Sequence, residues 1–173
     1  MKILLIGYMG CGKSTIGAHL AEILKYEFVD LDVYIEAKES QSVSELFKTK
    51  GEIYFRKKET IYLQEVLNKN ESSVIALGGG TPCYGNNMQL ILDTEEAKSI
   101  YLKLSIPYLV KRLEPEKIKR PLITHLKTPE ELIEFVGKHL FERSFYYSQA
   151  NFTIKADEKT IEEIVESIIM ELF

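Results

Sequence analysis

The stretch GYMGCGKST, residues 7–15, decides the fold of this chain. An apolar run, Ile3–Ile6, precedes it, and apolar residues at helical spacing follow it, beginning at Ile16 and Leu20. A glycine loop of the pattern Gly-x-x-x-x-Gly-Lys-Ser between a strand and a helix is typical of a phosphate-binding loop. The alternative is a glycine-rich turn with an incidental lysine, which the complete pattern in this context disfavours.

The residue types of this loop suit a nucleoside triphosphate with its metal ion. Gly7, Gly10 and Gly12 allow a tight turn that points successive backbone N–H groups inward, and the following helix adds the positive end of its dipole. A lysine at this position binds the outer phosphates, and the next serine can ligate Mg²⁺. We interpret Cys11 as a small residue that fits the loop; the alternative is a redox role, because helix N-termini lower thiol pKa values. The predicted nucleotide-binding residues of the loop are Gly10, Cys11, Gly12, Lys13, Ser14 and Thr15.

Length and composition indicate one domain spanning residues 1–173, with a sizeable core. The net charge of −4 disfavours a broad nucleic-acid surface. Cys11 and Cys83 provide no disulfide framework, and His19, His125 and His139 lack metal-type spacing. Neither a signal peptide nor an apolar run of membrane-spanning length is present, so we expect a cytoplasmic protein without membrane partners.

Strand and helix patterns alternate along the whole chain. Five buried strands with helical crossovers predict an α/β fold, a parallel sheet covered by helices on both faces. Ligands then bind beyond the C-terminal ends of the strands. Strands are predicted at 2–7, 27–30, 73–77, 99–104 and 151–155. Helices are predicted at 13–25, 32–39, 43–50, 53–68, 86–92, 107–113, 129–147 and 159–172.

Three local signals mark helix starts and one interruption. Thr128-Pro129-Glu130-Glu131 reads as an N-cap, a first-turn proline and a capping box, and Ser42 with Glu45 reads as a weaker box. The charged stretch 114–121 contains no strand pattern and carries an arginine. It is either a solvated loop or a mobile lid, since arginines on mobile segments serve phosphoryl-transfer sites.

Two residues that are candidates for binding the phosphate-accepting molecule stand at the end of the second strand, in Phe28-Val29-Asp30-Leu31-Asp32. Strand side chains alternate with period two, so we expect Asp30 and Asp32 to face the same side at the ligand edge of the sheet. One carboxylate can hold the metal while the other accepts the proton of an attacking hydroxyl. The alternative is a pair of helix-capping aspartates.

Three further elements have plain alternatives. Arg56 and Glu59 lie one helical turn apart, where a surface salt bridge is the ordinary interpretation. The strand 73–77 ends in Gly78-Gly79-Gly80, which permits close approach of a ligand to the backbone. Arg143, late in the long helix, reads on its own as a solvated arginine.

Taken together, GYMGCGKST, FVDLD, GEIYFR, ALGGG, KRPL and the late Glu142-Arg143 resemble the shikimate kinase family in order and spacing over nearly the whole chain. The resemblance implies a three-layer P-loop kinase fold related to nucleoside monophosphate kinases, with sheet order 2-3-1-4-5 and a lid at about 114–128. It implies phosphorylation of the 3-hydroxyl of shikimate by ATP on the way to chorismate, one Mg²⁺ per subunit, and a monomer.

The resemblance also assigns roles to single residues. It implies that Lys13, Asp32 and Arg120 are catalytic, with Asp32 also contacting the substrate hydroxyls as a candidate base. It implies that Ser14 and Asp30 lie at Mg²⁺, and that nucleotide contacts include Arg112, against adenine, and Arg120, on the lid. The substrate residues that it implies are Asp32, Arg56, Gly78, Gly79, Gly80 and Arg143, of which Arg56 and Arg143 bind the carboxylate.

One position departs from the family pattern, and other functions remain to be weighed. The family often has proline where this chain has Phe145, which bears on how Arg143 is aimed. A gluconate-type or nucleoside monophosphate kinase is the nearest alternative, although the carboxylates of FVDLD would repel a phosphate acceptor. A nucleotide-gated switch or a degenerate binding domain is the non-enzymatic alternative. Asn68-Lys69-Asn70-Glu71 lacks the aspartate of guanine-reading loops, and Asp32 and Arg120 are both retained.

Overall fold

The computed structural model describes all 173 residues and contains one five-stranded sheet. The strand order is β2-β3-β1-β4-β5, and every neighbouring pair is parallel, as predicted. The strands are β1 (Lys2–Ile6), β2 (Glu27–Asp30), β3 (Ser73–Ala76), β4 (Ala97–Lys103) and β5 (Phe152–Lys155).

Helices connect the strands at the positions that the sequence predicted, with ends that differ by one or two residues. The α-helices are α1 (Lys13–Leu24), α2 (Leu31–Glu39), α3 (Val43–Thr49), α4 (Gly51–Leu67), α5 (Asn87–Asp93), α6 (Ile106–Leu113), α7 (Pro129–Tyr147) and α8 (Ile161–Leu172). Two 3₁₀ helices were not predicted: η1 (Thr81–Cys83), after β3, and η2 (Glu114–Lys119), in the charged interruption.

Side-chain caps explain where several helices begin. The Thr128 hydroxyl accepts a hydrogen bond from the Glu131 N–H, and the Glu131 carboxylate accepts one from the Thr128 N–H, which is the predicted capping box of α7. The box of Ser42 and Glu45 at the start of α3 is also confirmed. A third box, Thr160 with Glu163, begins α8 and was not predicted.

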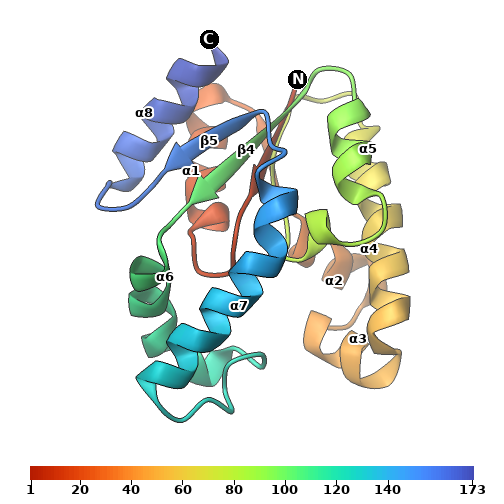
Figure 1. Cartoon of the computed structure of the whole chain (residues 1–173). Coiled ribbons are helices and arrows are strands. Elements are labelled where there is room, and N and C mark those ends of the chain that lie inside the picture. The colour runs from red at the N-terminus through yellow and green to blue at the C-terminus, as the bar shows by residue number, and fades with distance from the viewer.

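Helices cover both faces of the sheet (Figure 1), and the buried apolar side chains of the core pack between the sheet and these helices. Every residue of β1 is buried, as expected for the central strand of a parallel sheet. Helices α1 and α8 pack against each other on one face, and α5 packs against β4 while contacting α4 on the other. No helix has the length and apolar character that crossing a bilayer requires.

This topology brings three connections to one edge of the sheet. The loop after β1, the start of α2 after β2, and the glycine turn after β3 all leave from the C-terminal ends of neighbouring strands. The candidate residues of the sequence therefore meet where parallel sheets bind their ligands.

Candidate active site

The loop between β1 and α1 forms the phosphate-binding cradle predicted from GYMGCGKST. Gly12 precedes the helix with φ +97°, a left-handed conformation that residues with a Cβ rarely adopt. The free N–H groups of the first turn of α1 lie at the N-terminus of this helix, where the helix dipole favours an anion. Cys11 is 1% exposed, so its side chain packs inside while its backbone belongs to the loop.

A cavity of about 300 Å³ opens beside this loop. Its walls contain most residues that the sequence singled out, and they come from four separate segments of the chain. The lining residues are Met9, Gly10, Gly12, Lys13, Ser14, Thr15, Asp30, Asp32, Leu77, Gly78, Gly79, Glu116 and Arg120. Folding therefore brings the phosphate loop, the two aspartates and the candidate lid arginine around one space.

Lys13 is held by the loop that it follows. Its ammonium group donates hydrogen bonds to the carbonyl oxygens of Gly7, at 2.8 Å, and Tyr8, at 3.0 Å. The residue is only 9% exposed. An ionised phosphate oxygen attracts the ammonium group more strongly than a neutral carbonyl oxygen does, because both partners then carry a charge. Without an anion, the ammonium group of Lys13 thus binds these two carbonyls, and an anion bound in the loop would replace them as its partner.

Asp30 has two tasks at the end of β2. Its Oδ1 accepts hydrogen bonds from the N–H groups of Asp32 and Val33, so the capping interpretation is correct for this residue. Its Oδ2 accepts a hydrogen bond from the Ser14 hydroxyl at 2.5 Å. One oxygen starts the helix and the other joins Ser14 at the cavity, so the capping and metal-binding interpretations are compatible.

The geometric reasoning for Asp32 was wrong, although the residue does line the cavity with Asp30. The strand ends at Asp30, and Asp32 lies in the first turn of α2, so strand alternation does not set its direction. Burial raises the pKa of Asp32 to about 6, and repulsion by Asp30 and Glu59 adds to this while Lys13 opposes it. A carboxylate of that pKa suits proton transfer near neutral pH.

The turn Gly78–Gly80 is the point where three candidate acceptor residues meet the backbone. A Cβ on the first glycine would lie 2.9 Å from Oδ1 of Asp32. A Cβ on the second would lie 3.2 Å from Nη1 of Arg143, and one on the third would lie 2.8 Å from Nη2 of Arg56. Each glycine thus makes room for one charged side chain, so one carboxylate and two guanidinium groups converge on a single turn.

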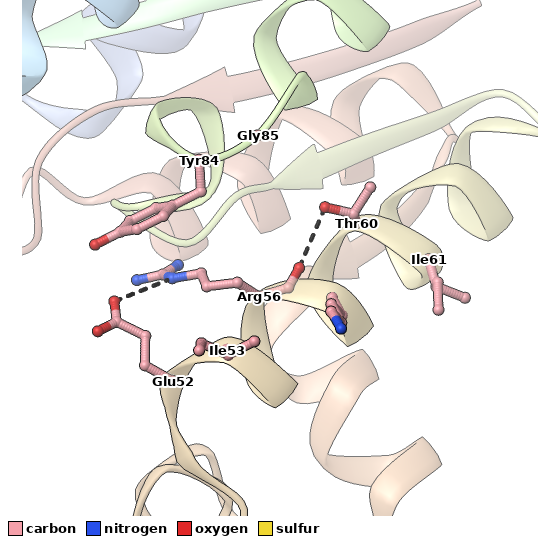
Figure 2. A pocket seen from close by; sticks show the side chains of 8 residues that line it. Glu52, Ile53, Arg56, Thr60, Ile61, Tyr84 and Gly85 are labelled. Atoms are coloured by element: carbon pink, nitrogen blue, oxygen red, sulfur yellow. Dashed lines mark hydrogen bonds and ion pairs between the residues drawn. The ribbon is translucent and has the colours of Figure 1, made fainter.

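Arg56 belongs to a buried network, so the interpretation of its pairing as a surface salt bridge was wrong. Its Nη1 donates to Oε2 of Glu59 at 2.9 Å, and Glu59 is 1% exposed. The Thr81 hydroxyl donates to the other oxygen of Glu59 at 2.7 Å. Figure 2 shows the outer side of the group, where Glu52 lies 3.7 Å from Arg56 Nε and the Tyr84 ring covers the guanidinium.

Arg143 projects from α7 toward the same turn, so the solvated interpretation was also wrong. Its Cζ lies 5.9 Å from the centroid of the Tyr8 ring, which is buried. One helical turn after Arg143, the Tyr147 hydroxyl donates a hydrogen bond to the carbonyl oxygen of Gly79 at 2.6 Å. The helix continues through Phe145, whose side chain is exposed. The Phe145 substitution therefore leaves the helix intact around Arg143.

Two further arginines lie near the phosphate loop. Arg120 follows η2 and lines the cavity, where Glu116 accepts a hydrogen bond from its Nε at 2.8 Å. Arg112, in α6, donates from Nη1 to the carbonyl of Cys11 at 3.3 Å. Arg112 thus contacts the nucleotide loop from outside the cavity, whereas Arg120 contributes to the cavity wall.

Sequence reasoning missed four residues of this region: Glu59 as a buried partner, Thr81, Tyr84 and Glu116. Helical spacing offered a signal for Glu116, which stands four residues before Arg120, and it already pointed to a pairing of Glu59. No pattern in the sequence connects Tyr84 or Thr81 with Arg56.

Comparisons with known proteins agree with this geometry. The family model described as "Shikimate kinase" matches residues 9–173. A shikimate kinase of Flavobacterium johnsoniae is 49% identical over 168 residues, which cover 97% of this chain and 96% of the relative.

Solved structures are similar over the same length. A crystal structure of shikimate kinase from Bacteroides thetaiotaomicron is 38% identical, with a TM-score of 0.91, covering 99% of this chain and 98% of that one. Shikimate kinase from Acinetobacter baumannii, solved in complex with shikimate, is 30% identical, with a TM-score of 0.84, covering 99% and 92%.

Proposed function

The chain belongs to the shikimate kinase family and phosphorylates shikimate with ATP, and we propose that the residues around its P-loop cavity divide this reaction among them as follows. The observation that carries the assignment is the turn Gly78–Gly80, where Asp32, Arg143 and Arg56 converge beside the phosphate loop. A small acceptor with one carboxylate and neighbouring hydroxyls matches two guanidinium groups and one aspartate.

Asp32 accepts the proton of the attacking 3-hydroxyl. Its raised pKa, about 6, leaves it ionised at neutral pH while keeping it more basic than an ordinary aspartate. Its position between the phosphate loop and the glycine turn supports this role. The proton moves to the carboxylate as the hydroxyl oxygen bonds to the γ-phosphorus and ADP leaves.

Arg56 and Arg143 bind and orient the substrate carboxylate. Both terminal nitrogens of Arg56 lie close to Gly80, and because Nη1 donates to Glu59, Nη2 is left for the substrate; Arg143 places Nη1 close to Gly79. Planar guanidinium groups form paired hydrogen bonds with carboxylates, which fixes the ring of the substrate and not only its charge. The backbone of Gly78, Gly79 and Gly80 forms the floor of this subsite.

The loop residues Gly10–Thr15 bind the nucleotide phosphates through their N–H groups. Lys13 leaves the two carbonyls that hold it and moves its charge to the outer phosphates. Arg112 contributes next to the loop at Cys11, where the resemblance expects adenine. Arg120 joins the transferring phosphate when the segment 114–128 closes as a lid over the cavity.

The residues present fit the Mg²⁺ that kinases of this type use. The Ser14 hydroxyl and Oδ2 of Asp30 meet at 2.5 Å on the cavity wall. Oxygen ligands suit Mg²⁺, which commonly takes few protein ligands and completes its shell with water and phosphate oxygens. Held there by Ser14 and Asp30 together with the nucleotide, Mg²⁺ would neutralise part of the phosphate charge.

A turnover panel tests this function. We expect ADP release in a coupled assay to depend on shikimate and to be absent with gluconate or AMP as acceptor. Phosphoryl transfer to either of the other acceptors at a comparable rate would replace the proposal by the related kinase. Nucleotide binding without transfer to any acceptor would indicate a binding domain instead.

Three statements about partners stay predictions of the sequence. A monomeric state, a cytoplasmic location and the absence of nucleic-acid or membrane partners were inferred from the family resemblance and from composition. Analytical ultracentrifugation and localisation of the tagged protein test the first two.

A further inference from the structure

The guanidinium group of Arg56 lies against the ring of Tyr84 (Figure 2). The distance from Arg56 Cζ to the ring centroid is 3.8 Å, which is a close stacking contact for a planar cation on an aromatic face. Tyr84 directly follows η1, whereas Arg56 lies in α4. The contact joins the helix that carries an acceptor arginine to the segment that continues the glycine turn.

The other sides of the guanidinium are also fixed. Phe55 and Phe47 have ring centroids 5.2 and 5.8 Å from Arg56 Cζ. Glu59 accepts the hydrogen bond from Nη1 at 2.9 Å, and Gly80 passes close to Nη2. Nε is buried without a hydrogen-bond partner, and the nearest carboxylate oxygen of Glu52 is 3.7 Å away. Hydrogen bonding therefore fixes one nitrogen, and packing must hold the rest of the plane.

Arg56 and Tyr84 both line an open hollow on the outer side of α4, and the Tyr84 ring covers one face of the guanidinium group there. The hollow has a volume of about 730 Å³ and is lined by Glu52, Ile53, Lys57, Thr60, Ile61 and Gly85 in addition to Arg56 and Tyr84. Tyr84 is 38% exposed, so its ring has one face toward solvent and one toward Arg56. Removing the ring would open the outer face of the guanidinium to water and to other side-chain rotamers.

We propose that Tyr84 is a positioning residue for the acceptor subsite: its ring holds the plane of Arg56 so that the free Nη2 edge stays aimed at the substrate carboxylate. The inference rests on the proposed role of Arg56 and deepens it. A fixed arginine loses less conformational entropy when the carboxylate binds, since flexible side chains pay for each rotamer that binding freezes. The contribution is to shikimate binding, not to phosphoryl transfer.

The test compares Tyr84→Ala, Tyr84→Leu and Tyr84→Phe in steady-state kinetics and in calorimetric titration with shikimate. We expect Tyr84→Ala to raise KM and Kd for shikimate about three- to tenfold, with kcat and KM for ATP unchanged. Tyr84→Phe should restore wild-type affinity because it keeps the aromatic face. Tyr84→Leu, which covers Arg56 without such a face, should fall between them and serves as the test if the alanine variant does not fold.

Arg56→Ala and the double variant Arg56→Ala/Tyr84→Ala separate the two levels of the proposal. Once Arg56 is gone, losing Tyr84 should cause no further loss of shikimate affinity. If Arg56→Ala itself leaves shikimate affinity unchanged, the proposed role of Arg56 is wrong. If Arg56→Ala weakens binding but Tyr84→Ala does not, or if Tyr84→Ala lowers kcat and both affinities alike, the positioning role alone is overturned.

Discussion

The Glu116 carboxylate pairs with the guanidinium group of Arg120 at the wall of the phosphate cavity. Oε2 of Glu116 accepts hydrogen bonds from both Nε, at 2.8 Å, and Nη2 of Arg120. The cation proposed to reach the transferring phosphate is therefore neutralised by a neighbour one helical turn earlier. ATP must displace this carboxylate or accept its repulsion.

Glu116→Gln should consequently improve nucleotide binding. The exposed pair is itself worth little, as exposed pairs usually are, but the variant also removes a negative charge from the space that the phosphates enter. We expect KM for ATP to fall about two- to fivefold at saturating shikimate, with KM for shikimate unchanged. Initial rates against ATP concentration measure the effect.

Glu134→Gln is the matched control. Glu134 pairs with Lys138 at 2.8 Å and the same helical spacing, with both side chains largely exposed on α7 and outside the cavity wall. It should leave both Michaelis constants unchanged. An unaltered or increased KM for ATP in Glu116→Gln would contradict the competition between Glu116 and the phosphates.

A second prediction concerns the pH dependence of the reaction. The pKa of Asp32 is raised to about 6, mainly by burial, so protonation removes the proposed base as the pH falls through 6. The logarithm of kcat/KM for shikimate should decline below that pH with a slope of one. The residual activity of Asp32→Asn should lack this acidic limb. If the limb persists in the variant, another group is responsible, and His139, whose pKa is lowered from 6.5 by burial and Arg143, is the first residue to substitute next.

The same pKa predicts a change in stability. Because the folded protein raises the pKa of Asp32 from 3.8 to about 6, the folded state binds its proton more tightly than the unfolded state. The stability associated with this group is greatest below pH 4 and is lost as the pH rises through 6. Asp32→Asn should therefore be more stable than wild type at pH 7, by up to about 3 kcal/mol.

Urea denaturation at pH 7 and at pH 3.5 checks this prediction. The gain in unfolding free energy should be present at neutral pH and nearly absent at pH 3.5, where the wild-type carboxyl group is itself protonated. Equal stability of the two proteins at pH 7 would mean that Asp32 carries no desolvation cost. The ionised Asp32 of the functional site would then not lower the free energy of unfolding.

The fold could be predicted largely because its signals are local. The burial of β1 and the capping box of Thr128 and Glu131 depend on residues only a few positions apart in the sequence. Local patterns of this kind predicted each strand of the sheet and each α-helix that connects the strands. The strand order has no local signal. It depends on which strands pair across long separations, and only the family resemblance supplied it.

Only part of the candidate site could be predicted from the sequence. Loop glycines and Lys13 follow from a short motif, but Asp32 was placed on the correct side through incorrect strand geometry. The burial of Glu59 and the stacking of Tyr84 on Arg56 arise when α4 packs beside the glycine turn. Residues 28 positions apart carry no periodic signal of such a contact, so the structure was needed to find it.

A further prediction concerns the second acceptor arginine. Arg143→Ala removes charge-assisted hydrogen bonds worth about 1.5–3 kcal/mol each, so KM for shikimate should rise roughly ten- to a hundredfold. KM for ATP should remain close to wild type. Lys138→Ala, at an exposed position of the same helix, is the control and should alter neither constant. An unchanged KM for shikimate in Arg143→Ala would remove this arginine from the carboxylate site.

Arg120→Ala should separate the lid from the acceptor subsite. Arg120 lines the phosphate cavity, whereas Arg56 and Arg143 lie at the glycine turn. We therefore expect Arg120 to contribute nothing to shikimate binding before the lid closes. A group that acts only in the transition state lowers kcat and kcat/KM together. Arginines supplied to phosphoryl-transfer sites are worth about 10³–10⁵ in rate, and we expect the lower end here because Lys13 shares the charge. Arg120→Lys should recover only part of the rate, since an ammonium cannot bridge two phosphate oxygens with a planar fork.

Calorimetric titration of the ATP-free variants should give wild-type affinity for shikimate. A large loss of that affinity with turnover preserved would place Arg120 in the acceptor subsite and overturn the lid assignment.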